Sequence, residues 1–97
     1  MATVVWAAGA LDALAAAHGD ASPGGAAAAG AIASAIALLS DHPLAGSRLR
    51  GYPSGDLRAL VIGHGAAGHV ALYRFLPLRQ EVRVLAIRGQ RALQFRP

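Results

Sequence analysis

The N-terminal part of the chain changes from a strand-like to a helical pattern of hydrophobic residues. The run Thr3 to Trp6 is β-branched and aromatic, which favours a short strand. The alanines that follow, together with Leu11 and Leu14, favour a helix that ends near His18. The chain is therefore expected to begin with a strand and a helix.

A second helix is expected after a break from Gly19 to Gly25. Ser22 and Pro23 suit its N-cap and its first helical position. Apolar residues at i, i+3, i+4 and i+7 predict one buried stripe, formed by Ile32, Ala35, Ile36 and Leu39. This helix should end before Pro43, because the residue that precedes a proline avoids helical geometry.

The second half of the chain carries three strand-like runs, which are Leu57 to Ile62, His69 to Leu76 and Glu81 to Arg88. Their connections are short, so neighbouring runs are expected to pair antiparallel. The segment Leu44 to Asp56, with Arg48 and Arg50, is predicted to be a loop. The order β-α-α-β-β-β predicts an α+β fold, a helical hairpin packed on an antiparallel sheet, as one domain over residues 1–97.

Charge is divided unequally between the two halves of the chain. Residues 1–47 carry three aspartates and no basic residue, whereas residues 48–97 carry nine arginines against Asp56 and Glu81, a balance of +7. Every basic residue is arginine, which binds phosphates and carboxylates bidentately. The second half is therefore expected to bind an acidic partner, although a GC-rich genome would also favour arginine and alanine codons.

Strict alternation along the strands gives each arginine apolar neighbours on its own face of the sheet. The expected groups are Arg74 with Val70 and Leu72, Arg88 with Val84 and Ala86, Arg58 with Leu60 and Ile62, and Arg83 with Leu85 and Ile87. An arginine beside core residues needs a counter-charge or a water-filled cleft. The pattern favours an anion site that includes Arg58, Arg74 and Arg88, with structural ion pairs and solvated edges as the alternative.

Two further motifs indicate neither a cofactor nor a metal. Gly63 to Gly68 matches G-x-G-x-x-G, but a strand follows it, so a hairpin turn is the better prediction. His64 and His69 could face each other across this turn, yet no nearby Cys or carboxylate completes a zinc site. Catalysis without a metal would have to move protons through His64, His69, Glu81 or a tyrosine.

One side of the second predicted helix carries no charge. It is formed by small and apolar residues, namely Ala27, Ala31, Ser34 and Leu38. Small residues permit close packing against another element, whereas an exposed apolar surface often binds a partner. The sequence is compatible with both interpretations.

Four segments follow one another with a familiar order and spacing, and they are Asp41 to Gly46, Leu57 to Ile62, Val70 to Arg74 and Val82 to Arg91. Over about residues 32–91 they resemble the RelE/ParE family of bacterial toxins. The resemblance implies a helical hairpin on a curved antiparallel sheet and a role as the toxin of a type II toxin–antitoxin module. It also implies a cognate acidic antitoxin, which would bind along Ala27, Ala31, Ser34 and Leu38.

The same resemblance implies two possible targets. RelE-like members cleave mRNA on the ribosome, and ParE-like members inhibit DNA gyrase. RelE-like cleavage uses lysines and a C-terminal tyrosine, whereas this chain has no lysine and carries Phe95 in that place. We therefore expect a ParE-like toxin, as in plasmid-stabilisation systems, that inhibits gyrase by binding it through Arg58, Arg74, Arg83, Arg88 and Arg91.

Two alternatives to the gyrase inhibitor follow from the resemblance. The first is a metal-independent mRNA endonuclease that uses Arg58, Arg74 and Arg88 at the scissile phosphate. The second is an attenuated copy that only binds its antitoxin.

The sequence also predicts a cytoplasmic protein without membrane contact. The N-terminus lacks the basic start of a signal peptide, and the most apolar stretch, Gly24 to Leu39, is too short to span a bilayer. A hetero-oligomer with the antitoxin is the expected assembly.

Overall fold

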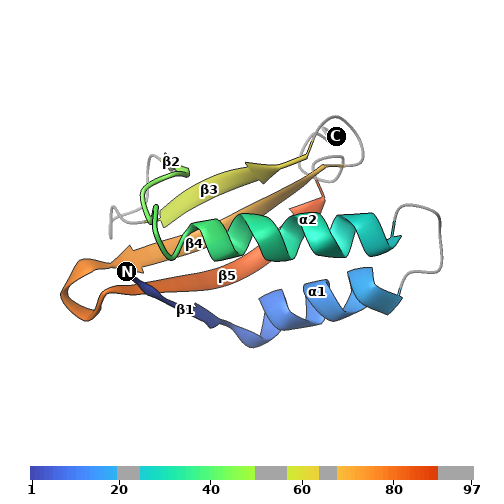
Figure 1. The fold of residues 1–97 in the computed structure, drawn as a ribbon, viewed down its shortest axis with the longest axis horizontal. Helices are drawn as coiled ribbons and strands as arrows, with labels where there is room; N and C mark the ends of the chain where they lie inside the picture. The colour runs from blue at the N-terminus through green and yellow to red at the C-terminus, as the bar shows by residue number, and fades with distance from the viewer. Residues whose placement is uncertain (20–24, 50–56, 64–67, 90–97) are drawn as a thin grey trace.

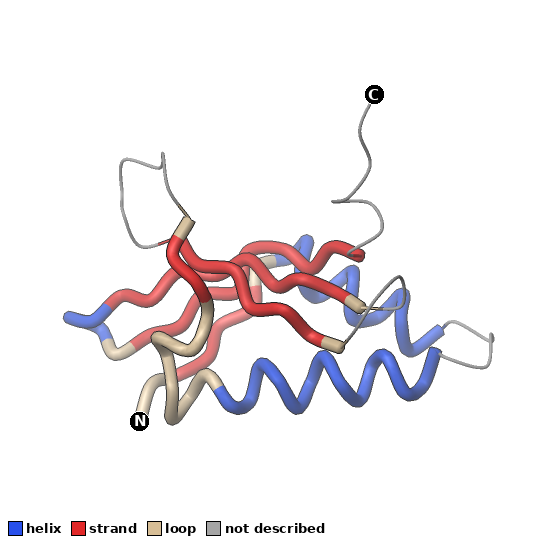
Figure 2. The backbone as a smooth tube through the Cα atoms, turned by 90° about the horizontal axis from the view of Figure 1, so that it is seen from above, coloured by secondary structure: helices blue, strands red, loops and turns tan. Residues whose placement is uncertain are grey.

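Two helices cover one face of a five-stranded sheet in the computed structural model, which describes residues 1–19, 25–49, 57–63 and 68–89 (Figures 1 and 2). In chain order the elements are β1 (Thr3–Trp6), α1 (Ala8–Gly19), α2 (Gly25–Leu38), β2 (Ser47–Arg48), β3 (Leu57–Ile62), β4 (His69–Leu76), the 3-10 turn η2 (Pro77–Arg79) and β5 (Glu81–Gly89). The predicted α+β fold is confirmed. The proposed N-cap, Ser22, lies outside the described residues.

The sheet is mixed rather than purely antiparallel, with the strand order β1-β5-β4-β3-β2. Strands β3, β4 and β5 pair antiparallel, as their short connections predicted. Strand β1 instead pairs parallel to β5, with Val4 opposite Val82. The chain returns from the helical hairpin into β2, which runs antiparallel to β1, and it then reverses at β3, β4 and β5, so that β5 runs parallel to β1.

A short strand lies in the segment that was predicted to be a loop. Strand β2 places Ser47 opposite Ala59 and Arg48 opposite Arg58, at the edge of the sheet beside β3. The N–H of Leu49 extends the pairing by donating to the Leu57 carbonyl at 2.9 Å. Two residues are too few for an alternating pattern, so the sequence carried no signal for this strand.

The core lies between the helices and the strands, and the predicted stripe of α2 forms much of it. Ile32, Ile36 and Leu39 are at most 1% exposed. They pack in one cluster with strand residues such as Val82 and Val84. Burial of each such side chain stabilises the fold by about 1.5–3 kcal/mol.

A β-bulge in β5 changes which side chains share a face. Its register against β4 shifts, so β5 carries one extra residue at this point. Strict alternation predicted Ile87 beside Arg83 and Val84 beside Arg88, and both predictions are wrong. Ile87 and Val84 are buried in the core. Arg83 and Arg88 therefore lie together on the other face of the sheet.

The segment after α2 is fastened to the sheet by the hydroxyl of Tyr73, a residue of β4 that is 0% exposed. This hydroxyl donates to the Pro43 carbonyl and accepts from the N–H of Gly46, each at 2.8 Å. A Cβ atom on Gly46 would lie 2.7 Å from Tyr73 Cε1 and 2.8 Å from the Ala59 carbonyl oxygen. Only glycine permits this approach.

Replacing Gly46 by alanine should lower the free energy of unfolding by about 1–3 kcal/mol, because the added methyl group overpacks the contact with Tyr73. Gly30→Ala is the matched control, since a Cβ at Gly30 on α2 meets nothing within 4 Å. That control should raise stability by about 0.5–1 kcal/mol through helix propensity. Urea unfolding of both variants measures the difference, and an equal effect of the two substitutions would contradict the close packing.

Candidate anion-binding face

The face of the sheet opposite the helices gathers three of the predicted arginines. We call it the helix-free face. Cross-strand register assigns to it Thr3, Val5, Leu57, Ala59, Val61, Val70, Leu72, Arg74, Leu76, Glu81, Arg83, Ala86 and Arg88. Most of these side chains are aliphatic, and only four of them are charged. Arg74, Arg83 and Arg88 are its cations, and Glu81 is its one acid among the described residues.

Arg74 and Arg83 are direct cross-strand neighbours. Like charges in such positions repel each other and destabilise the pair. Arg83 is compensated by Glu81, whose Oε2 accepts from Nη2 at 2.7 Å and from Nε at 3.0 Å. Arg74 Nε, by contrast, is buried and has no hydrogen-bond partner in the structure. The pair therefore has more donors than the protein itself satisfies.

Arg88 lies on the same face, further along β5, opposite Val70. Its side chain is exposed. Its partner Val70 lies four residues along β4 from Arg74, the partner of Arg83. Arg88 is therefore about four residue rises of about 3.3 Å from Arg83. Arg91, the remaining predicted contact, lies outside the described residues.

Arg58 lies on the opposite, helix-covered face and is not brought together with Arg74 and Arg88. It is the direct cross-strand neighbour of Tyr73. Its Nη1 donates to the Gly46 carbonyl at 2.8 Å and, more weakly, to the Leu44 carbonyl at 3.4 Å. Arg58 therefore holds the segment after α2 in place beside the hydroxyl of Tyr73.

Tyr73 has an unusual acidity because of these surroundings. Burial raises the pKa of its phenol above the ordinary value of 10.0, and the Gly46 N–H and the Arg58 charge oppose this effect. The raised pKa means that the folded chain binds the phenolic proton more tightly than the unfolded chain. This contribution to stability is complete below pH 10 and is lost as the pH rises above it.

The uncharged side of α2 is exposed where the structure describes its side chains. Ala31, Ser34 and Leu38 are exposed, with Leu38 at 49%, whereas the side chain of Ala27 is outside the described set. Packing against another element of the chain is therefore not the role of these three residues.

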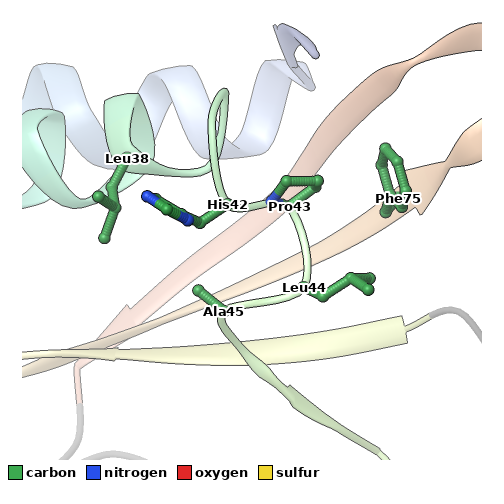
Figure 3. Close-up of a pocket in the computed structure, with 6 residues that line it drawn as sticks. All are labelled: Leu38, His42, Pro43, Leu44, Ala45 and Phe75. Atoms are coloured by element: carbon green, nitrogen blue, oxygen red, sulfur yellow. The ribbon is translucent and has the colours of Figure 1, made fainter. Parts of the chain in front are cut away.

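A hollow of about 500 Å³ begins at the C-terminal end of α2. It is lined by Leu38, His42, Pro43, Leu44, Ala45 and Phe75. Figure 3 shows Leu38 and His42 on one side, Phe75 of β4 on the other, and Pro43 between them. The hollow is thus mostly apolar and has one imidazole at its rim, which suits an apolar side chain.

Sequence reasoning missed three residues that organise these surfaces. Tyr73 and Gly46 were named only within segments of the family resemblance, and Glu81 was named as an acid that could move protons, not as the partner of Arg83. The signal for Tyr73 was its position on the apolar face of a predicted strand. A buried tyrosine needs a hydrogen-bond partner for its hydroxyl. Glu81 could have been found from its i, i+2 spacing to Arg83, which places both side chains on one face of a strand.

Two remaining predictions concern a metal and a membrane. His64 lies outside the described residues, and residues 1–19, 25–49, 57–63 and 68–89 contain no group of three potential metal ligands. Neither described helix is long and apolar enough to cross a membrane.

Tyr73→Phe should lower the free energy of unfolding by about 1–3 kcal/mol, because it leaves the Gly46 N–H and the Pro43 carbonyl without their partner. The variant should also lose less stability than the parent chain between pH 10 and higher pH, since it lacks the phenol with the raised pKa. Chemical unfolding at several pH values tests both statements. Parallel pH curves for the two proteins would contradict the assignment to Tyr73.

Comparisons with known proteins place this architecture. No protein-family model matches the sequence, and no curated protein sequence matches it. Among solved structures, a chain of the intact E. coli RelBE toxin–antitoxin complex superimposes with a TM-score of 0.68 at 13% identity, over 92% of this chain and 96% of that one. A mutant of E. coli toxin RelE in the free state, with two arginines replaced by alanine, gives 0.67 at 17% identity, over 95% and 87%. The chain has the RelE-like toxin fold.

Proposed function

We propose that this chain is the toxin of a type II toxin–antitoxin pair and that a cognate acidic antitoxin neutralises it. The observation that carries the proposal is the likeness to RelE, which extends over more than nine-tenths of the chain. The +7 balance of residues 48–97 supports an acidic partner, because complementary charge speeds association.

The target we propose is mRNA on the ribosome. Gyrase inhibition, which the sequence favoured, has no support from the two structural neighbours described above, which are RelE structures. The RelE-like alternative takes its place. Arg74, Arg83 and Arg88 would hold phosphate groups on the helix-free face, where guanidinium groups bind oxyanions well. No proton-transfer residue is assigned to this face.

The antitoxin would bind on the other side of the molecule. Ala31, Ser34 and Leu38 offer an exposed uncharged surface on α2, and the hollow beside Leu38 continues it toward Phe75. An amphipathic segment can lay its apolar residues into such a groove. We place one apolar antitoxin side chain in the hollow, between Leu38 and Phe75.

Induced expression in bacteria, with and without the adjacent gene, tests the proposal. The chain alone should stop growth, and the neighbouring product should restore it. With purified components, mRNA should be cleaved on ribosomes in the presence of the chain while gyrase supercoiling continues. Normal growth in both strains, or inhibited supercoiling with intact mRNA, would contradict this function.

Two variants locate the antitoxin surface within the same experiment. Leu38→Glu should remain toxic but resist rescue by the antitoxin, because it places a negative charge in the apolar hollow. Ala33→Glu, which adds the same charge at another exposed position of α2, should be rescued normally. Equal rescue of both variants would exclude the hollow as the antitoxin site.

A further inference from the structure

The ion pair between Glu81 and Arg83 lies inside a region of surplus positive charge. Both donors of Arg83 that approach Glu81 meet the same oxygen, Oε2, at 2.7 and 3.0 Å. The Glu81 side chain is 16% exposed and that of Arg83 is 42% exposed. Glu81 is thus the more buried member of the ion pair. It binds one edge of the Arg83 guanidinium, and the Arg83 side chain is otherwise partly exposed to solvent.

Arg74 receives no such compensation. It stands directly opposite Arg83 in the sheet, and its Nε is buried without a hydrogen-bond partner. A buried donor without a hydrogen-bond partner destabilises the fold relative to a satisfied one. Its other neighbour in the same row is Leu57, which has no acceptor in its side chain. An anion from outside the chain would offset the repulsion between the two guanidinium groups.

We propose that Arg74 and Arg83 together form a phosphate-binding site on the helix-free face, and that Glu81 is a built-in counter-ion that competes with the phosphate for Arg83. This inference deepens the proposed function, on which it rests for the carrier of the phosphate, an RNA strand. Glu81 is a tuning residue rather than a contact: it weakens anion binding at Arg83 while the site is empty.

Arg74 and Arg83 lie side by side on neighbouring strands, and this arrangement favours a phosphate over a second carboxylate. Glu81 shows what one carboxylate achieves here, since both of its hydrogen bonds go to Arg83 and none goes to Arg74. A tetrahedral phosphate directs its oxygens to both arginines from one position. Arg88, about four residue rises away on the same face, suits a further phosphate of the same strand.

Fluorescence anisotropy with a short labelled oligouridylate at low salt tests the site on the full chain. Arg74→Gln and Arg83→Gln should each weaken binding about tenfold, the effect of one lost charge-assisted contact. Arg74→Lys should weaken it as well, because lysine keeps the charge but lacks the planar fork. Arg79→Gln, at an exposed arginine of η2 outside the row, should change the affinity less than about twofold.

Glu81→Gln gives the opposite sign and isolates the counter-ion. It should tighten oligouridylate binding about threefold to tenfold by releasing Arg83. Asp12→Asn removes the same charge from an exposed site on α1 and should have little effect. In the double variant Glu81→Gln with Arg83→Gln the gain should disappear, because the competitor has nothing left to release.

Three results would overturn the inference. They are a loss for Arg79→Gln as large as that for Arg74→Gln, unchanged or weaker binding for Glu81→Gln, and tighter binding of oligoglutamate than of oligouridylate, which would assign the site to an acidic protein. Circular dichroism of each variant verifies that it is folded. Binding is measured without reference to toxicity, so a chain that fails to stop growth can still show the site, and a toxic chain can still lack it.

Discussion

The hydroxyl of Tyr73 connects the sheet to the segment that follows α2, and several other features depend on this connection. By donating to Pro43 and accepting from Gly46 it fixes both ends of a four-residue turn. Arg58 fixes the same turn through the Gly46 carbonyl. Because β2 begins at the next residue, Ser47, the edge of the sheet also depends on this anchor. A hydroxyl with two partners can be buried at little cost, whereas an unpartnered one cannot.

The anchored turn and the bulge in β5 together account for how the arginines are divided between the two faces. Arg58 is used on the helix-covered face, where carbonyl oxygens of the anchored turn accept its protons. The bulge in β5 sends Arg83 and Arg88 to the other face, beside Arg74. The molecule thus has two chemically different sides. One is an apolar hollow and an uncharged helix, and the other is an aliphatic sheet face with three guanidinium groups and one carboxylate.

The sequence predicted most of the fold because its signals were local. The stripe from Ile32 to Leu39 has helical spacing, and strands β1, β3 and β4 have the predicted bounds. The parallel pairing of β1 was not predictable from short connections, since it joins the two ends of the chain. The faces of Arg83 and Arg88 were not predictable either, because a single extra residue in β5 reverses the alternation. The role of Arg58 depends on Gly46, twelve residues away in the chain and adjacent only after folding.

The most direct test of this account follows the arginine Nε–H signals of the folded chain by NMR during titration with oligouridylate. The account predicts that the signals of Arg74 and Arg83 move together and saturate at the same RNA concentration, while that of Arg58 stays in place. A shift of the Arg58 signal with the others, or an unmoved Arg74 signal, would contradict the division of the arginines between the two faces.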